Sequence, residues 1–152
     1  MKIVIDRFSP PSIEVLESIA TEQLKLLPAV FRPHVAGLVI RIEEFVDEET
    51  MTELGLESEF DLLGLYSGVA LADKSIGNTA TDVDMIILYR RAILDYWCET
   101  DEDLSHLVRH VLIHEIGHHF GFSDEDMERI ENSLEPVQTS LEPAKTTSDT
   151  FK

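Results

Sequence analysis

A long amphipathic segment in the second half of the chain sets the strictest limit on the fold. Between residues 100 and 120 the apolar side chains recur at steps of three and four residues, which is the period of one helix face. Thr100 with Asp103 three positions later is typical of a helix start, and Gly121 is suited to end the helix. The sequence therefore predicts a helix over residues 100–120. Its apolar face comprises Leu104, Leu107, Val108, Val111, Leu112 and Ile116.

The same segment carries the pattern H-E-x-x-H, which begins at His114. Residues four apart in an α-helix share a face and lie about 6 Å apart along the axis, so both imidazoles can reach one ion. A catalytic zinc takes three protein ligands and keeps a fourth position for water. Gly121 can turn the chain back after the helix, and Asp124 follows it by three residues. We therefore predict that zinc is bound by His114, His118 and Asp124.

The extended pattern H-E-x-x-H-x-x-G-x-x-D is specific, because a shuffled chain of this composition would contain it about once in 10,000 trials. Asp124 also has a simpler explanation, since a helix dipole stabilises an acidic residue in the first turn without any metal. Glu125 and Asp126 are alternative third ligands. Two imidazoles and a carboxylate also suit divalent ions other than zinc, so zinc is an expectation from the donor set.

Earlier segments predict a further helix and a small set of strands. Residues 11–27 have helical periodicity. Residues 47–61 are dense in acidic side chains, have room for one helical turn and are interrupted by Gly55, so they are expected to form a long, mobile loop. The last predicted strand carries apolar residues on both faces, so both should be covered, and it should pair with the preceding strand as a hairpin. A short helix beginning near Ser123 is expected at the end. The predicted strands cover residues 36–46, 64–71 and 83–90, and the last helix covers residues 124–134.

Length and charge limit the number of domains and the kind of partner. The chain has 152 residues, which suits one domain; we place it at residues 1–135 and expect a disordered tail over residues 136–152. A formal net charge of -18 disfavours nucleic acid and anionic membrane surfaces as partners. The N-terminus has no secretory core segment, and a lone cysteine, Cys98, fits a reducing compartment, so we expect a cytoplasmic protein.

Three segments resemble one known family. HEIGHHFGFSDEDM (residues 114–127), LLGLYSGVAL (residues 62–71) and DMIILYRRAIL (residues 84–94) are similar to the minimal zincin-like metallopeptidases, a family of small bacterial proteins. The resemblance implies an α+β fold in which a small mixed sheet packs against helices, one of which carries the motif in the second half of the chain. It also implies that the protein is a metallopeptidase acting on a peptide or protein substrate.

The residues themselves permit metal-assisted hydrolysis, with Glu115 as the general base that takes a proton from a zinc-activated water. The sequence does not identify the donor that would stabilise an oxyanion. Tyr66, Tyr89 and His119 are the candidates. An extended substrate peptide is expected along a sheet edge beside the motif helix. The alternative hypothesis is a zinc-stabilised binding module without proteolytic activity, whose acidic surface engages a basic partner.

Three further positions on the predicted helix, His106, His110 and Gly117, need an interpretation. His106 and His110 extend the row of histidines backwards at four-residue steps. His106 is about 12 Å along the axis from His114, too far to share its ion, and both residues are interpreted as a polar flank, with His110 also able to line the cleft. Gly117 is unfavourable inside a helix, which indicates a close contact with the sheet or with a substrate strand.

Overall fold

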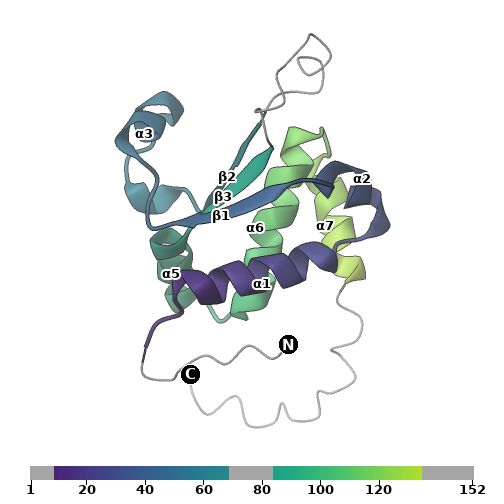
Figure 1. Ribbon diagram of the computed structural model, residues 1–152, viewed down its shortest axis with the longest axis horizontal. Coiled ribbons are helices and arrows are strands. Elements are labelled where there is room, and N and C mark those ends of the chain that lie inside the picture. The colour runs from purple at the N-terminus through teal and green to yellow at the C-terminus, as the bar shows by residue number, and fades with distance from the viewer. Residues whose placement is uncertain (1–8, 69–83, 135–152) are drawn as a thin grey trace.

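The computed structural model describes residues 9–68 and 84–134 (Figure 1). Within these ranges helices surround a small three-stranded sheet, so the fold is α+β, as predicted. The elements in chain order are α1 (Ile13–Lys25), η1 (Ala29–Phe31), α2 (Arg32–Val35), β1 (Val39–Glu43), α3 (Glu48–Leu54), η2 (Glu59–Asp61), β2 (Gly64–Ser67), β3 (Met85–Tyr89), α5 (Arg90–Glu99), α6 (Leu104–His119) and α7 (Asp124–Ser133).

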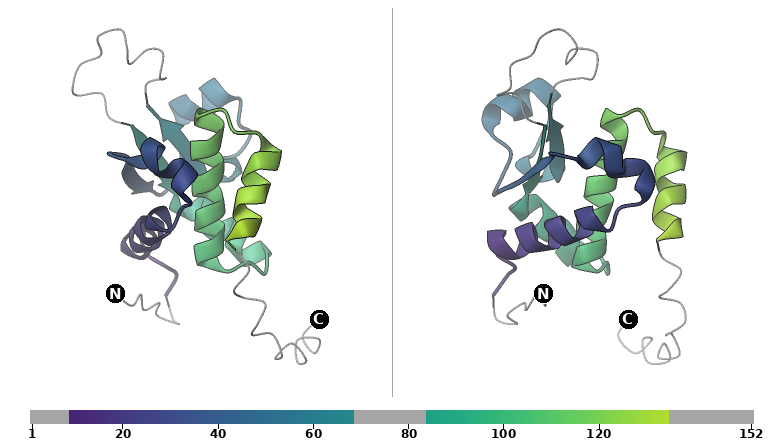
Figure 2. Two further views of the ribbon diagram at one scale, coloured as in Figure 1. Left: turned by 90° about the vertical axis from the view of Figure 1, so that its right-hand side faces the viewer. Right: turned by 45° about the vertical axis from the view of Figure 1, so that its right-hand side comes forward.

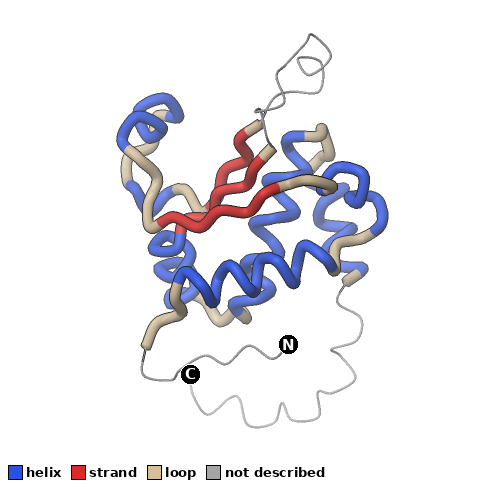
Figure 3. The backbone as a smooth tube through the Cα atoms, in the orientation of Figure 1, coloured by secondary structure: helices blue, strands red, loops and turns tan. Residues whose placement is uncertain are grey.

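The sheet is mixed, and the last strand of the chain lies in its centre (Figure 3). The strand order is β1-β3-β2, with β1 parallel to β3 and β2 antiparallel to it. Ile40 on β1 and Tyr66 on β2 are both opposite Ile86 on β3. The predicted antiparallel pairing of the second and third strands is therefore confirmed. As a result, β2 is an edge strand, and it packs against α6.

The main hydrophobic core lies between one face of the sheet and the two long helices α1 and α6, which cross each other (Figure 2). Ile86 and Leu88 of β3 are fully buried there, beside Leu16 of α1. On the opposite face of β3, Ile87 packs with a second cluster around Val46. Both faces of this strand are covered, as its apolar pattern predicts. All six predicted core residues of α6 are also buried.

The prediction of a loop over residues 47–61 is wrong, because this segment folds into α3 and the short helix η2. The carboxylate of Asp47 accepts a hydrogen bond of 2.7 Å from the backbone N–H three residues later, which caps the start of α3. Gly55, with a φ of 68°, ends the helix in the left-handed conformation. Met51 packs against buried Val46. The acidic side chains are thus on a capped helix that the glycine terminates rather than interrupts.

Two details around α5 also differ from the prediction. Strand β3 runs directly into α5. No glycine or proline marks the boundary between the two elements, so the sequence did not predict this helix. Arg90 at this junction donates to the backbone carbonyl of Pro11 at 2.7 Å and to Glu44 at 2.9 Å. Thr100 then ends α5, and Asp103 rather than Thr100 caps α6 by accepting two backbone N–H groups.

Several predicted features lie outside the described residues: the end of the second strand, the first residue of the third, the connection between them, and the tail after residue 135. In the ranges 9–68 and 84–134, no helix is both long and apolar enough to span a membrane.

Candidate metal centre

The chain reverses direction at the end of α6, as the glycine in the motif predicts. Gly121 has a φ of 87°, a left-handed conformation that favours glycine. Its backbone N–H donates to the carbonyl of His118 at 3.2 Å, and the N–H of Phe122 donates to the carbonyl of Gly117 at 2.8 Å. These bonds complete the last turn of α6. They also bring the start of α7, where Asp124 lies, back toward the histidines.

Helix α7 packs closely on α6 through a glycine. A Cβ atom at Gly117 would overlap the Sδ atom of Met127 and would lie 3.0 Å from its Cγ atom. Met127 is fully buried at this contact. The close contact expected at Gly117 therefore exists, but its partner is α7 and not the sheet or a substrate strand. The absence of a side chain at Gly117 lets α7 approach α6 closely.

The first turn of α7 fixes which of its acidic residues faces the histidines. Ser123 and Asp126 form a reciprocal capping box, with side-chain to backbone distances of 3.1 and 3.3 Å. Asp126 also accepts a hydrogen bond of 2.9 Å from Arg129, and these bonds together hold the pKa of Asp126 below its ordinary value. Glu125 lines a separate surface hollow with Arg129. Asp124 alone among the three acidic residues joins the histidine group.

The structure brings the three predicted zinc ligands together. One ligand atom each from His114, His118 and Asp124 lie within 4.8 Å of one another. The Nε2 atom of His118 is 3.1 Å from Oδ1 of Asp124, close to the separation of two ligands that are each about 2 Å from one ion. The imidazole planes of the two histidines are 87° apart, with ring centroids 5.8 Å apart. Two nitrogen donors and a carboxylate oxygen fit a catalytic zinc site, which is open on the exposed side of His118.

The electrostatic environment of His114 also suits a metal ligand. Partial burial lowers its pKa, and nearby His110 lowers it further, whereas Glu131 and Asp124 act in the opposite direction. A histidine binds a metal ion through a neutral ring nitrogen, so an environment that favours the neutral form removes part of the cost of deprotonation.

Glu115 lies on the side of α6 that faces β2. Burial raises the pKa of its carboxyl group, while His118 and a hydrogen bond from the backbone N–H of Tyr66 lower it. The carboxylate is therefore both partly desolvated and oriented by the edge strand. A desolvated carboxylate with a raised pKa is a better proton acceptor than an exposed glutamate.

A cleft of about 320 Å³ lies beside these residues, between α6, α5 and the start of β2. Glu115 and the two histidines of the motif line it, together with Gly64 of β2 and Tyr96 of α5. A Cβ atom at Gly64 would lie 2.7 Å from Cγ1 of Val111, so the missing side chain lets the edge strand approach α6. Glu115 and both motif histidines thus share one open cavity, and Asp124 lies beside His118 outside the lining of that cavity.

The tyrosines considered as oxyanion donors do not line this cleft. Tyr66 stacks on His119, with ring centroids 3.9 Å apart, and burial together with Asp84 raises the pKa of its hydroxyl. Tyr89 is 2% exposed, and burial raises its pKa to about 12. Tyr96, which the sequence analysis missed, is 43% exposed and lines the cleft. Only the helical phase of the unpredicted α5 could have indicated it.

Comparison with known proteins agrees with this geometry. The sequence matches the family model described as zincin-like metallopeptidase over residues 35–134, which extends from α2 to the end of α7 and includes the whole sheet. No curated protein matches the chain significantly. Because the matched residues make up more than half of the sequence and contain the complete motif, the chain belongs to the zincin-like metallopeptidase family.

Proposed function

We propose that this protein is a zinc-dependent peptidase in which His114, His118 and Asp124 bind the metal and Glu115 is the general base. The observation that carries the proposal is the convergence of three potential ligands from two helices, two of which line one cleft together with the half-buried Glu115. Membership in the zincin-like metallopeptidase family supports the same assignment.

A zinc ion bound at this site would supply Lewis acidity, which brings the pKa of a coordinated water near neutrality and polarises a carbonyl group. Glu115 is one residue from His114 and about 100° around the helix from it, so its carboxylate lies outside the group of three ligands and lines the cleft beside them. Glu115 accepts a proton from the attacking water and then donates it to the leaving amine. The backbone N–H of Tyr66 keeps this carboxylate oriented toward the cleft.

The edge strand β2 is the proposed docking site for the substrate. The backbone carbonyl of Leu63 accepts a hydrogen bond from Tyr89 at 2.9 Å, so odd-numbered residues of this strand face β3. Gly64 and Tyr66 therefore direct their backbone groups away from β3, where the N–H of Tyr66 already donates to Glu115. Gly64 also lines the cleft, so an extended peptide that pairs with this edge would pass beside Glu115. A peptide or protein substrate follows from this arrangement.

The substitution Glu115→Gln tests the mechanism. It keeps the size of the side chain and its hydrogen-bond acceptor but removes the base, so we expect zinc content and thermal unfolding to be unchanged and peptide hydrolysis to fall by at least about 100-fold. Glu22→Gln, at an exposed position of α1, is the matched control and should keep full activity. Hydrolysis at the wild-type rate in Glu115→Gln would contradict the mechanism.

The alternative, a zinc-stabilised binding module, uses the same ligands and the high negative charge of the chain. Such a module needs no base in a cleft beside the metal. The burial of Glu115 favours the peptidase. Burying a carboxylate is unfavourable, and a structural zinc site does not need a carboxylate at this position. Tight binding of basic proteins by a zinc-loaded but inactive wild type would instead favour the module.

A further inference from the structure

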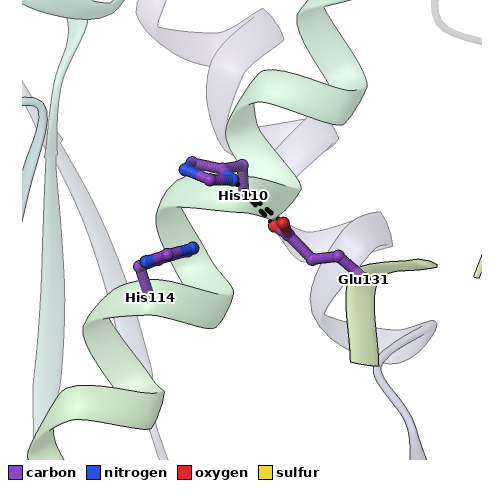
Figure 4. A group of neighbouring side chains, drawn as sticks. All are labelled: His110, His114 and Glu131. Carbon is purple, nitrogen blue, oxygen red and sulfur yellow. Dashed lines mark hydrogen bonds and ion pairs between the residues drawn. The ribbon is translucent and has the colours of Figure 1, made fainter. Parts of the chain in front are cut away.

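A second group of potential ligands lies next to the predicted zinc site on the same face of α6. His110 is one turn before His114, and Glu131 reaches it from α7 (Figure 4). The Nδ1 atom of His110 is 2.8 Å from one carboxylate oxygen of Glu131 and 3.1 Å from the other. The rings of His110 and His114 have centroids 4.1 Å apart. One ligand atom from each of the three residues lies within 4.8 Å of the others.

The position of Glu131 follows from the packing of α7 on α6. The close contact between Gly117 and Met127 sets the distance between the two helices, and Glu131 is one turn beyond that contact. Its side chain is only 20% exposed, while that of His110 is 50% exposed. Glu131 is thus held against the row of histidines rather than extended into solvent.

The surroundings of this pair favour a cation. A surface hollow of about 490 Å³ adjoins His110 and Glu131, and His110 also lines the cleft beside the motif. Three consecutive acidic residues at positions 101–103 line the hollow, together with His106, Arg109 and Asn132. Acidic side chains around an open hollow raise the local concentration of cations. A divalent ion can therefore reach the pair from this hollow.

We propose that His110 and Glu131 form a second divalent-cation site that overlaps the first and competes with it for His114. A neutral imidazole offers one lone pair, so His114 ligates one ion at a time. His110 and Glu131 bind only the ion in the second site. That ion is held more weakly whenever His114 is bound to the ion in the first site. In terms of the proposed function, on which this consequence rests, excess zinc inhibits the enzyme by drawing His114 away from the ion beside Glu115.

Zinc titration of the metal-free full chain tests the second site independently of activity. The wild type should show a tight step and a weaker step. Glu131→Gln and His110→Ala should each weaken the second step by at least about tenfold and leave the first unchanged. His118→Ala, which damages only the first site, should still bind one zinc ion, and the double variant His118→Ala/Glu131→Gln should lose it. The matched controls, Glu128→Gln and His106→Ala, should titrate like the wild type.

The outcomes separate this inference from the proposed function. One binding step in the wild type together with complete loss of zinc in His118→Ala would overturn the second site and leave the peptidase proposal standing. Unchanged zinc titration in Glu131→Gln and His110→Ala, with activity lost at limiting zinc, would also overturn it, because the pair would then act on the substrate. Failure of the wild type to bind any zinc would overturn both proposals.

Discussion

Burial shifts the pKa values of two neighbouring motif residues in opposite directions, and both shifts suit the proposed chemistry. It lowers the pKa of His114, which favours the neutral form that binds a metal, and it raises the pKa of Glu115, which makes the carboxylate a stronger base. The sequence predicts which residues occupy these positions. It cannot predict the degree of burial, because that depends on how β2 and α5 pack around α6.

The burial of the Tyr89 hydroxyl can be tested through its effect on stability at high pH. Its pKa is raised from 10.0 to about 12, mainly by burial, so the folded protein binds this proton more tightly than the unfolded chain does. The stability linked to this proton is fully present below pH 10.0 and is lost as the pH rises through about 12. The loss amounts to about 2 kcal/mol at pH 12.

We therefore expect Tyr89→Phe to lose less unfolding free energy than the wild type between pH 10 and 12, measured by urea denaturation. Tyr96→Phe removes a hydroxyl from an exposed tyrosine and is the matched control. Equal losses in Tyr89→Phe and the wild type would show that the Tyr89 hydroxyl is not buried as described.

At the scale of elements, the sequence predicts what local chemistry determines. The period of α6, the glycine that ends it and the Ser123 cap of α7 are local signals, and the structure confirms each of them. Helix α3 was missed although Asp47 and Gly55 are its caps, because the acidic composition suggested a loop. Helix α5 follows β3 without a break, so no local signal separates them. The roles of Tyr96, His110 and Glu131 depend on how these helices pack, which periodicity does not reveal.

The contact between α6 and α7 predicts a coupled effect of two substitutions. Gly117→Ala places a Cβ atom against Met127 and should push α7 outward, which moves Asp124 away from the histidines. We expect zinc affinity to fall by about tenfold, because one ligand then lies at the wrong distance. Overpacking costs about 1–3 kcal/mol of stability, partly offset by the better helix propensity of alanine.

Met127→Ala should relieve the overlap. The double variant Gly117→Ala/Met127→Ala is expected to be less destabilised than the sum of the single variants, and to bind zinc more tightly than Gly117→Ala alone, as measured by calorimetric titration and thermal unfolding. Strict additivity of both properties would mean that Gly117 does not set the spacing of the two helices.

In the whole molecule, the site lies between two helices that contribute unequally to the hydrophobic core. Helix α6 is anchored in the main core, whereas α7 buries a single residue of its own, Met127. An ion held by residues of both helices would therefore link the end of the described chain to the core. The net charge of -18 surrounds this site with a negative field, which favours cationic substrates over anionic ones.

This field predicts a dependence of hydrolysis on substrate charge. Of two peptides that differ only in having lysine or glutamate outside the scissile residues, the lysine peptide should have the higher kcat/KM, by about tenfold at low ionic strength. The advantage should shrink toward unity at about 0.5 M salt, where exposed charges are screened within a few ångströms. An advantage that persists at high salt would indicate a specific pocket rather than the overall field.

The proposed binding of zinc by one face of α6 and the start of α7 can be measured as the zinc content of the untagged protein beside that of His114→Ala. His114 belongs to both ligand groups, so its loss leaves each group with two ligands, too few for tight binding at limiting metal. We predict about one zinc per chain at limiting metal in the wild type and in the control His106→Ala, and none in His114→Ala. Equal zinc content in the wild type and His114→Ala, or no zinc in either, would mean that these residues do not form a zinc site.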